Sequence, residues 1–198
     1  DKCGKNVPNC HLYDAKMLCV QCEHIAIINA RQRELYNQKV KTLPKTYQQT
    51  YHTDDEIKGY ANKNVFIYGK ITRTGKTALA IDILKYQWAR GMSGRYIYFP
   101  TWIRRYVNSK HADKLSMFNE LIDQKGLLII DDLGGDKIEM GVALPVINDR
   151  LMDRRQTILI SNLSLEELGD LDDRLAARIK EECILIARKN KKGNNGTT

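Results

Sequence analysis

Short apolar runs alternate with longer amphipathic segments along most of the chain. Runs rich in β-branched and aromatic residues predict strands at 64–68, 95–99, 127–131, 157–161 and 183–187. Apolar residues recur at helical spacing between them, as Leu79, Ile83 and Leu84 do within 76–90. Further helices are predicted at 101–108, 113–125 and 138–154, with a short pair at 164–180. This alternation indicates an α/β fold with a mostly parallel sheet that helices cover.

The first 62 residues follow a different pattern. Residues 25–40 predict a helix, which Leu43-Pro44-Lys45 ends, and the polar residues 45–62 indicate a linker or a segment leading into the core. We therefore divide the chain into a Cys-rich module (1–24), a helix and linker (25–62), an α/β core (63–189) and a basic disordered tail (190–198).

The first strand of the core is followed by a polar loop and then by a helix, in the order Gly69-Lys70-Ile71-Thr72-Arg73-Thr74-Gly75-Lys76-Thr77. Such a P-loop turns backbone N–H groups toward phosphate oxygens, and the helix N-terminus adds partial positive charge. We expect Lys76 to contact the β- and γ-phosphates of ATP and Thr77 to bind Mg²⁺. The expected nucleotide-binding residues of this loop are Gly69, Thr74, Gly75, Lys76, Thr77 and Ala78.

This loop departs from the usual spacing of its motif. Five residues separate Gly69 from Gly75 where four are usual, and Lys70 stands where a glycine is common. We expect ATP to be both bound and hydrolysed. A protein that binds nucleotide without hydrolysing it is the alternative that the longer loop favours.

Two later strands end in polar residues. Asp131 and Asp132 follow four apolar residues, and we expect Asp131 to hold Mg²⁺ and Asp132 to deprotonate the attacking water. Asn162 follows the strand at 157–161. In ATPases whose fourth strand lies between the first and the third, such a residue contacts the γ-phosphate or the water. The alternative for Asn162 is a helix cap.

The composition adds a basic charge and a cluster of cysteines. The net charge of +8 favours polyanionic partners, and no apolar run approaches the roughly 20 residues of a membrane helix. We expect a cytoplasmic protein without a membrane partner. Four cysteines precede residue 23, with a C-x₂-C pair among them, so we expect a zinc site formed by Cys3, Cys10, Cys19 and Cys22. His11 and His24 are possible substitutes, and Cys183 is expected in the core.

Together, the loop, the acidic strand end and Asn162 resemble the AAA+ superfamily. More narrowly, the chain resembles bacterial and phage replicative helicase loaders of the DnaC/DnaI type over residues 43–189. Residues 43–47 resemble the segment before the ATPase core of those proteins, and 158–168 resemble their sensor stretch. Residues 173–179 resemble their arginine-finger helix, and 183–189 resemble their last strand.

The resemblance implies a five-stranded parallel core flanked by helices, without a full lid domain. It also implies ATP-dependent self-association with ATP at the subunit interfaces. Arg178 would then be the arginine finger, with Arg174 as the second candidate. The implied catalytic residues are Lys76, Asp132, Asn162 and Arg178.

The same resemblance implies a replicative DNA helicase and single-stranded DNA as partners. The DNA-binding candidates are the cations Arg104, Arg105, Lys110 and Lys114, with Trp102 and Tyr106 interleaved as stacking residues. An ordinary amphipathic helix with its aromatics in the core is the alternative. The implied function is ATP-dependent loading of the helicase, with the Cys-rich module gripping it. The alternatives are a transposition helper ATPase related to IstB and a non-hydrolysing, nucleotide-switched adaptor.

Overall fold

The computed structural model of the protein describes residues 20–49 and 55–188, and side chains from residue 30 onward. Its centre is a five-stranded parallel sheet in the order β2-β3-β4-β1-β5. The strands are β1 (Val65–Tyr68), β2 (Gly94–Tyr98), β3 (Leu127–Leu133), β4 (Thr157–Ser161) and β5 (Ile184–Ala187). The predicted α/β fold is confirmed, and β4 lies between β3 and β1 as expected for Asn162 to act beside the loop.

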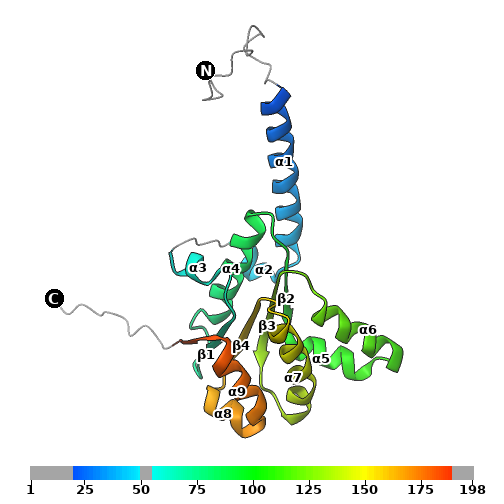
Figure 1. Cartoon of the computed structure of the whole chain (residues 1–198), viewed down its shortest axis with the longest axis vertical. Helices are drawn as coiled ribbons and strands as arrows, with labels where there is room; N and C mark the ends of the chain where they lie inside the picture. Colours follow the sequence, from blue (N-terminus) through cyan, green and yellow to red (C-terminus); the bar gives the residue numbers. More distant parts are fainter. Residues whose placement is uncertain (1–19, 50–54, 189–198) are drawn as a thin grey trace, which may run out of the picture.

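Helices cover both faces of the sheet, in the order shown in Figure 1. They are α1 (Val20–Lys41), α2 (Lys45–Gln48), α3 (Asp55–Tyr60), α4 (Lys76–Ala89), α5 (Phe99–Asn108), α6 (His111–Ile122), α7 (Lys137–Met152), α8 (Leu165–Leu171) and α9 (Asp173–Glu182). None of the helices in this described part of the chain has the length and apolar character that crossing a membrane requires.

Two hydrophobic clusters form the core, one on each face of the sheet. Strand side chains alternate between the faces, so Phe66 joins one cluster while Val65 and Ile67 join the other. The Phe66 cluster contains apolar residues of α5, α6, α7, α8 and α9. The second cluster contains residues of α4 together with Leu43 and Ile57. Burial on both faces explains why the strands appear in the sequence as continuous apolar runs.

The N-terminal part differs from the expectation. The helix α1 begins at Val20 rather than at 25 and extends away from the α/β body (Figure 1), while Tyr36 and Val40 near its end pack against the second cluster. The segment 45–62 contains α2 and α3 rather than a plain linker, and Ile57 is buried. Two buried apolar residues in a polar segment, Ile57 and Ala61, leave no periodic pattern, so the sequence did not predict these helices.

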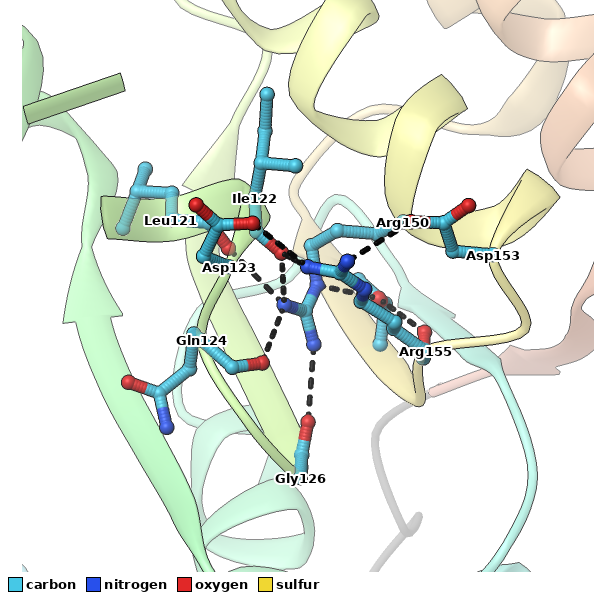
Figure 2. Close-up of polar contacts among 9 residues, drawn as sticks. Leu121, Ile122, Asp123, Gln124, Gly126, Arg150, Asp153 and Arg155 are labelled. Atoms are coloured by element: carbon cyan, nitrogen blue, oxygen red, sulfur yellow. Dashed lines mark hydrogen bonds and ion pairs between the residues drawn. The ribbon is translucent and has the colours of Figure 1, made fainter. Parts of the chain in front are cut away.

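A buried arginine ties together the edge of the sheet where β3 and β4 begin. The guanidinium of Arg150 on α7 donates hydrogen bonds to one hydroxyl and to several backbone carbonyls, as Figure 2 shows. The acceptors are Thr157 Oγ1 and the carbonyl oxygens of Leu121, Ile122, Gln124, Gly126 and Gln156, at 2.9–3.2 Å. The bonds join the end of α6 to the starts of β3 and β4.

Candidate functional site

The phosphate loop joins β1 to α4 at the carboxyl edge of the sheet. Gly69 and Gly75 have φ angles of 155° and 82°, which favour glycine. A Cβ at Gly69 would also clash with the carbonyl oxygen of Arg188, which follows β5. Arg73 has φ 60° although it carries a side chain, which is a local strain of the longer loop.

Lys76 begins α4, and its side chain turns back over the loop. Its Nζ donates to the carbonyl oxygens of Gly69 at 2.6 Å and Ile71 at 3.0 Å. Burial lowers the pKa of Lys76, whereas the charges of Asp131 and Asp132 raise it. The ammonium is therefore held inside the curve of the loop, beside the acidic end of β3.

Thr77 and Asp131 meet as the sequence predicts. Thr77 Oγ1 lies 3.1 Å from Asp131 Oδ2, and Tyr96 Oη on β2 donates to the same oxygen at 2.7 Å. Burial raises the pKa of the Asp131 carboxyl, whereas the hydrogen bonds from Tyr96 and Thr77 lower it. The sequence analysis missed Tyr96, because no motif relates it to Asp131 and only the register of β2 against β3 brings it there.

Asp132 and Asn162 are also brought together. Asn162 Nδ2 donates to Asp132 Oδ1 at 2.9 Å, and Tyr98 Oη donates to Asp132 Oδ2 at 2.9 Å. The hydrogen bond to Asp132 is the main cause that raises the pKa of Tyr98. Asp132 has φ 65°, so the backbone is left-handed at this residue, one before the end of β3. Tyr98 is a further residue of the site that the sequence analysis missed.

Lys70, the residue that departs from the motif, contacts α8. Its Nζ lies 2.6 Å from Glu167 Oε1, and this contact is the largest cause that lowers the pKa of Glu167 to about 2. Glu167 also accepts from the backbone N–H of Ser164, as part of the capping box that begins α8. The longer loop is therefore attached to the helix that follows Asn162.

The arginine-finger candidates lie on α9. Arg178 Nε donates to Asn148 Oδ1 on α7 at 3.2 Å, and Arg178 NH1 lies 3.8 Å from Glu181. Arg174 is 76% exposed in its side chain and lies 3.6 Å from Asp172. Within the described residues, these contacts are with α7, α9 and its cap rather than with the phosphate loop.

The aromatic residues expected to stack on DNA differ in exposure. Trp102 is buried at 5% exposure between Phe99 and Tyr106, with ring centroids 5.7 and 5.2 Å away, which favours the alternative that it is a core residue of an amphipathic helix. Tyr106 is partly exposed, and Lys114 Nζ lies 5.7 Å from its ring centroid. The cations Arg104, Arg105 and Lys110 are exposed on α5 and at the start of α6.

The expected zinc ligands are not described by the structure. Cys3, Cys10 and Cys19 lie outside the described residues, and Cys22 lies in α1 where side chains are not described. From residue 30 to 188, apart from 50–54, no group of three or more His, Cys, Asp and Glu residues is placed to hold a metal ion. The zinc site stays a prediction. Cys183 packs against the Phe66 cluster of the core, as expected, and burial raises the pKa of its thiol to about 12.

The sheet order, the phosphate loop and the acidic end of β3 define the class: an AAA+ P-loop protein. The family model described as the bacterial DnaA ATPase domain matches residues 45–185, and the chain belongs to that family. The resemblance to DnaC/DnaI-type AAA+ proteins is confirmed.

Three similar proteins illustrate the relationship. The replicative helicase loader DnaI of Bacillus subtilis is 26% identical over 153 residues, which are 69% of this chain and 49% of DnaI. A crystal structure of the DnaC helicase loader matches with a TM-score of 0.62 and 21% identity, over 74% of this chain and 100% of that one. AMPPCP-bound DnaA from Aquifex aeolicus matches with a TM-score of 0.60 and 22% identity, over 74% of this chain and 51% of that one. The chain thus spans about half the length of DnaI.

Proposed function

We propose that this chain hydrolyses ATP and, as an ATP-dependent oligomer, loads a replicative DNA helicase onto single-stranded DNA. The observation that carries the proposal is the convergence of Lys76, the Thr77–Asp131 pair and the Asp132–Asn162 pair at one edge of the sheet. The similarity to DnaI, a replicative helicase loader by name, supports the choice of client.

Two features of the site fit a nucleoside triphosphate with Mg²⁺. Gly75, the N-cap of α4, has no side chain to cap the helix, so the first N–H groups of α4 can bind phosphate oxygens. The Thr77 hydroxyl and the Asp131 carboxylate, 3.1 Å apart, are the oxygen ligands that Mg²⁺ prefers. We assign backbone contacts with phosphate to Gly69, Thr74, Gly75 and Ala78.

The side chains have separate roles in the proposed reaction. When bound, ATP supplies the γ-phosphoryl group and Mg²⁺ neutralises charge on its oxygens. Lys76 exchanges the carbonyl oxygens of Gly69 and Ile71 for phosphate oxygens. Thr77 and Asp131 hold the cation, and Asp132, oriented by Asn162, accepts the proton of the attacking water.

Steady-state ATP hydrolysis and equilibrium binding of a fluorescent ATP analogue test these roles. We expect Lys76→Ala to abolish binding, and Asp132→Asn to retain binding while lowering kcat by about 100-fold or more. Lys125→Ala and Asp170→Asn are controls, since both residues are exposed and outside the site. Wild-type turnover in Lys76→Ala and Asp132→Asn would show that the site is wrongly assigned.

The proposed oligomer places an arginine of α9 at the ATP of a neighbouring subunit. Arg178 is the proposed finger, and it would have to release Asn148 to reach that ATP. Mixing Arg178→Ala with Lys76→Ala subunits tests this role. Where the two kinds of subunit meet, the Lys76→Ala subunit supplies an intact Arg178 and the Arg178→Ala subunit supplies an intact phosphate loop. Recovery of hydrolysis on mixing supports the proposal. Recovery with Arg174→Ala in place of Arg178→Ala identifies Arg174 as the finger instead.

The proposed binding of a replicative DNA helicase is tested with purified proteins. We expect the intact chain to retain the host replicative helicase on an affinity column in the presence of ATP and zinc, and to lose it on deletion of residues 1–29. The deletion leaves Tyr36 and Val40, which pack against the core. Retention of a transposase instead favours the transposition helper. Helicase retention without any ATP hydrolysis favours the nucleotide-switched adaptor.

We also propose that Cys3, Cys10, Cys19 and Cys22 bind one Zn²⁺, with His11 and His24 as possible substitutes. Metal analysis of the protein purified without added chelator is expected to give one zinc per chain. The variant Cys19→Ser/Cys22→Ser should lose it, whereas Cys183→Ser serves as the control. Equal zinc content in both variants would contradict the assignment.

A further inference from the structure

Two tyrosines of β2 contact the acidic end of β3. Tyr96 Oη donates to Asp131 Oδ2 at 2.7 Å, and Tyr98 Oη donates to Asp132 Oδ2 at 2.9 Å. We propose that both are positioning residues for ATP hydrolysis: Tyr96 orients the magnesium ligand and Tyr98 orients the carboxylate that activates water. The inference rests on the proposed function, in which Asp131 is a magnesium ligand and Asp132 accepts the proton of the attacking water.

The backbone explains how one face of β2 reaches both acids. Tyr96 and Tyr98 are two residues apart in a strand, so their side chains share a face, whereas Ile97 is buried in the core. Asp131 and Asp132 are adjacent, and regular alternation would point them to opposite faces. The φ of 65° at Asp132 and the register shift between β3 and β4 near it break this alternation.

Each carboxylate is held between two elements of the fold. Asp131 accepts from Tyr96 of β2 and Thr77 of α4, and Asp132 accepts from Tyr98 of β2 and from Asn162, which follows β4. A carboxylate can accept about four hydrogen bonds. Two donors therefore fix the orientation of each acid and leave lone pairs for a cation or a water.

Both phenols are suited to be permanent donors. A tyrosine hydroxyl can both donate and accept a hydrogen bond, whereas an ionised carboxylate can only accept. Each phenol therefore donates to its acid, Tyr96 to Asp131 and Tyr98 to Asp132. A phenylalanine at either position would keep the ring and remove only the donor.

The role of Tyr98 is tested by hydrolysis with the full chain. We expect Tyr98→Phe to lower kcat about tenfold while the affinity for ATP stays unchanged, because the lost donor orients Asp132 only. Tyr86→Phe is the matched control, since the Tyr86 hydroxyl contacts Arg90 on the surface of α4. In an Asp132→Asn background, Tyr98→Phe should have no further effect. A kcat equal to that of Tyr86→Phe overturns the role of Tyr98.

The role of Tyr96 is tested without turnover. Binding of a fluorescent ATP analogue is measured as Mg²⁺ is titrated, and Tyr96→Phe is expected to need about tenfold more Mg²⁺ for half-maximal effect. Its affinity for the analogue in EDTA should equal that of the wild type. An unchanged Mg²⁺ requirement, or an equal loss of affinity in EDTA, overturns this role.

Failure of the inference differs from failure of the proposed function. If Asp132→Asn hydrolyses ATP like the wild type, or the wild type does not hydrolyse ATP, the proposed reaction fails and the role of Tyr98 fails with it. If Asp132→Asn is inactive while Tyr98→Phe is fully active, only the inference fails. Thermal unfolding of each variant checks that Tyr96→Phe, which alters a half-buried residue, is folded.

Discussion

At the scale of single residues, Lys70 shows how an unusual phosphate loop is accommodated. Its ammonium contacts Glu167, which also completes the capping box of α8 with Ser164. The side chain of Lys70 is 76% exposed, so this ion pair adds little to overall stability. Its effect is local, because it attaches the loop to the helix behind Asn162.

The pKa of Glu167 reports this contact. The folded-state value of about 2 lies below the ordinary 4.5, so the stabilisation is complete above pH 4.5 and is lost as the pH falls toward 2. We expect Lys70→Met to raise the pKa of Glu167, with the Ser164 hydrogen bonds retained. Carboxyl NMR titration measures it, with Lys58→Met as the control. An unchanged value in Lys70→Met would contradict the contact.

Arg150 stabilises the fold and lies outside the proposed catalytic site. It is fully buried, and the acceptors found for it among the described residues are carbonyl oxygens and one hydroxyl. Burial is the main cause that lowers its pKa to about 10, so it stays charged at neutral pH. The end of α6 supplies partial negative charge to balance it.

Loss of Arg150 should therefore be costly. We expect Arg150→Met to lower the free energy of unfolding by about 3–5 kcal/mol, because it leaves several buried carbonyls without a donor. Urea denaturation measures the effect. Arg155→Met is the control, since Arg155 is one-third exposed, pairs with exposed acids and donates to one carbonyl, that of Ile122, to which Arg150 also donates; it should cost about 1 kcal/mol or less. A similar cost for both variants would contradict the proposed role of burial.

At the scale of elements, the sequence predicted what depends on local pattern. All five strands lie within two residues of their predicted bounds, because buried parallel strands are continuous apolar runs. The strand ends also predicted that Asp131, Asp132 and Asn162 would lie at one carboxyl edge of the sheet, where Asp131 contacts Thr77 and Asp132 contacts Asn162. Tyr98 could not be predicted in the same way, because its contact depends on cross-strand register and on the irregular backbone at Asp132.

The helix α5 shows that spacing alone does not distinguish a core aromatic residue from a partly exposed one. Trp102 and Tyr106 are four residues apart and stack on each other, but only Tyr106 is partly exposed. We expect Trp102→Ala to cost about 3–5 kcal/mol in the free energy of unfolding, because it opens a cavity in the core. Tyr106→Ala should cost less and should selectively weaken binding to labelled single-stranded DNA. Weaker DNA binding by folded Trp102→Ala alone would contradict this division.

At the scale of the whole molecule, the proposed catalytic groups and the buried Arg150 lie at opposite edges of the sheet. The proposed catalytic groups lie at the carboxyl edge of the sheet, and Arg150 holds the opposite edge, where β3 and β4 begin. The exposed cations of α5 belong to a chain of net charge +8. We therefore expect a polyanion to be attracted by the net charge and to contact α5 and α6.

This arrangement predicts strongly salt-dependent DNA binding. The logarithm of the affinity for single-stranded DNA should fall linearly with the logarithm of salt concentration, by about 0.7 per phosphate contact. Removing Arg104 and Arg105 by Arg104→Glu/Arg105→Glu should make the slope shallower by about 1.4. Fluorescence anisotropy over a salt series measures it. The control Arg90→Glu/Lys125→Glu carries the same charge change elsewhere, and an equal change of slope in it would refute specific contacts by α5.

The position of β1 has a consequence for synthesis of the chain. Val65 pairs with Ile158 of β4 on one side and with Ile184 of β5 on the other, both far later in the sequence. A ribosome adds about 5–20 residues per second, so β1 waits on the order of ten seconds for both neighbours. During that time its apolar residues have two open edges, which other nascent chains can pair with. The strand that leads into the phosphate loop is therefore completed only when β4 and β5 have been synthesised.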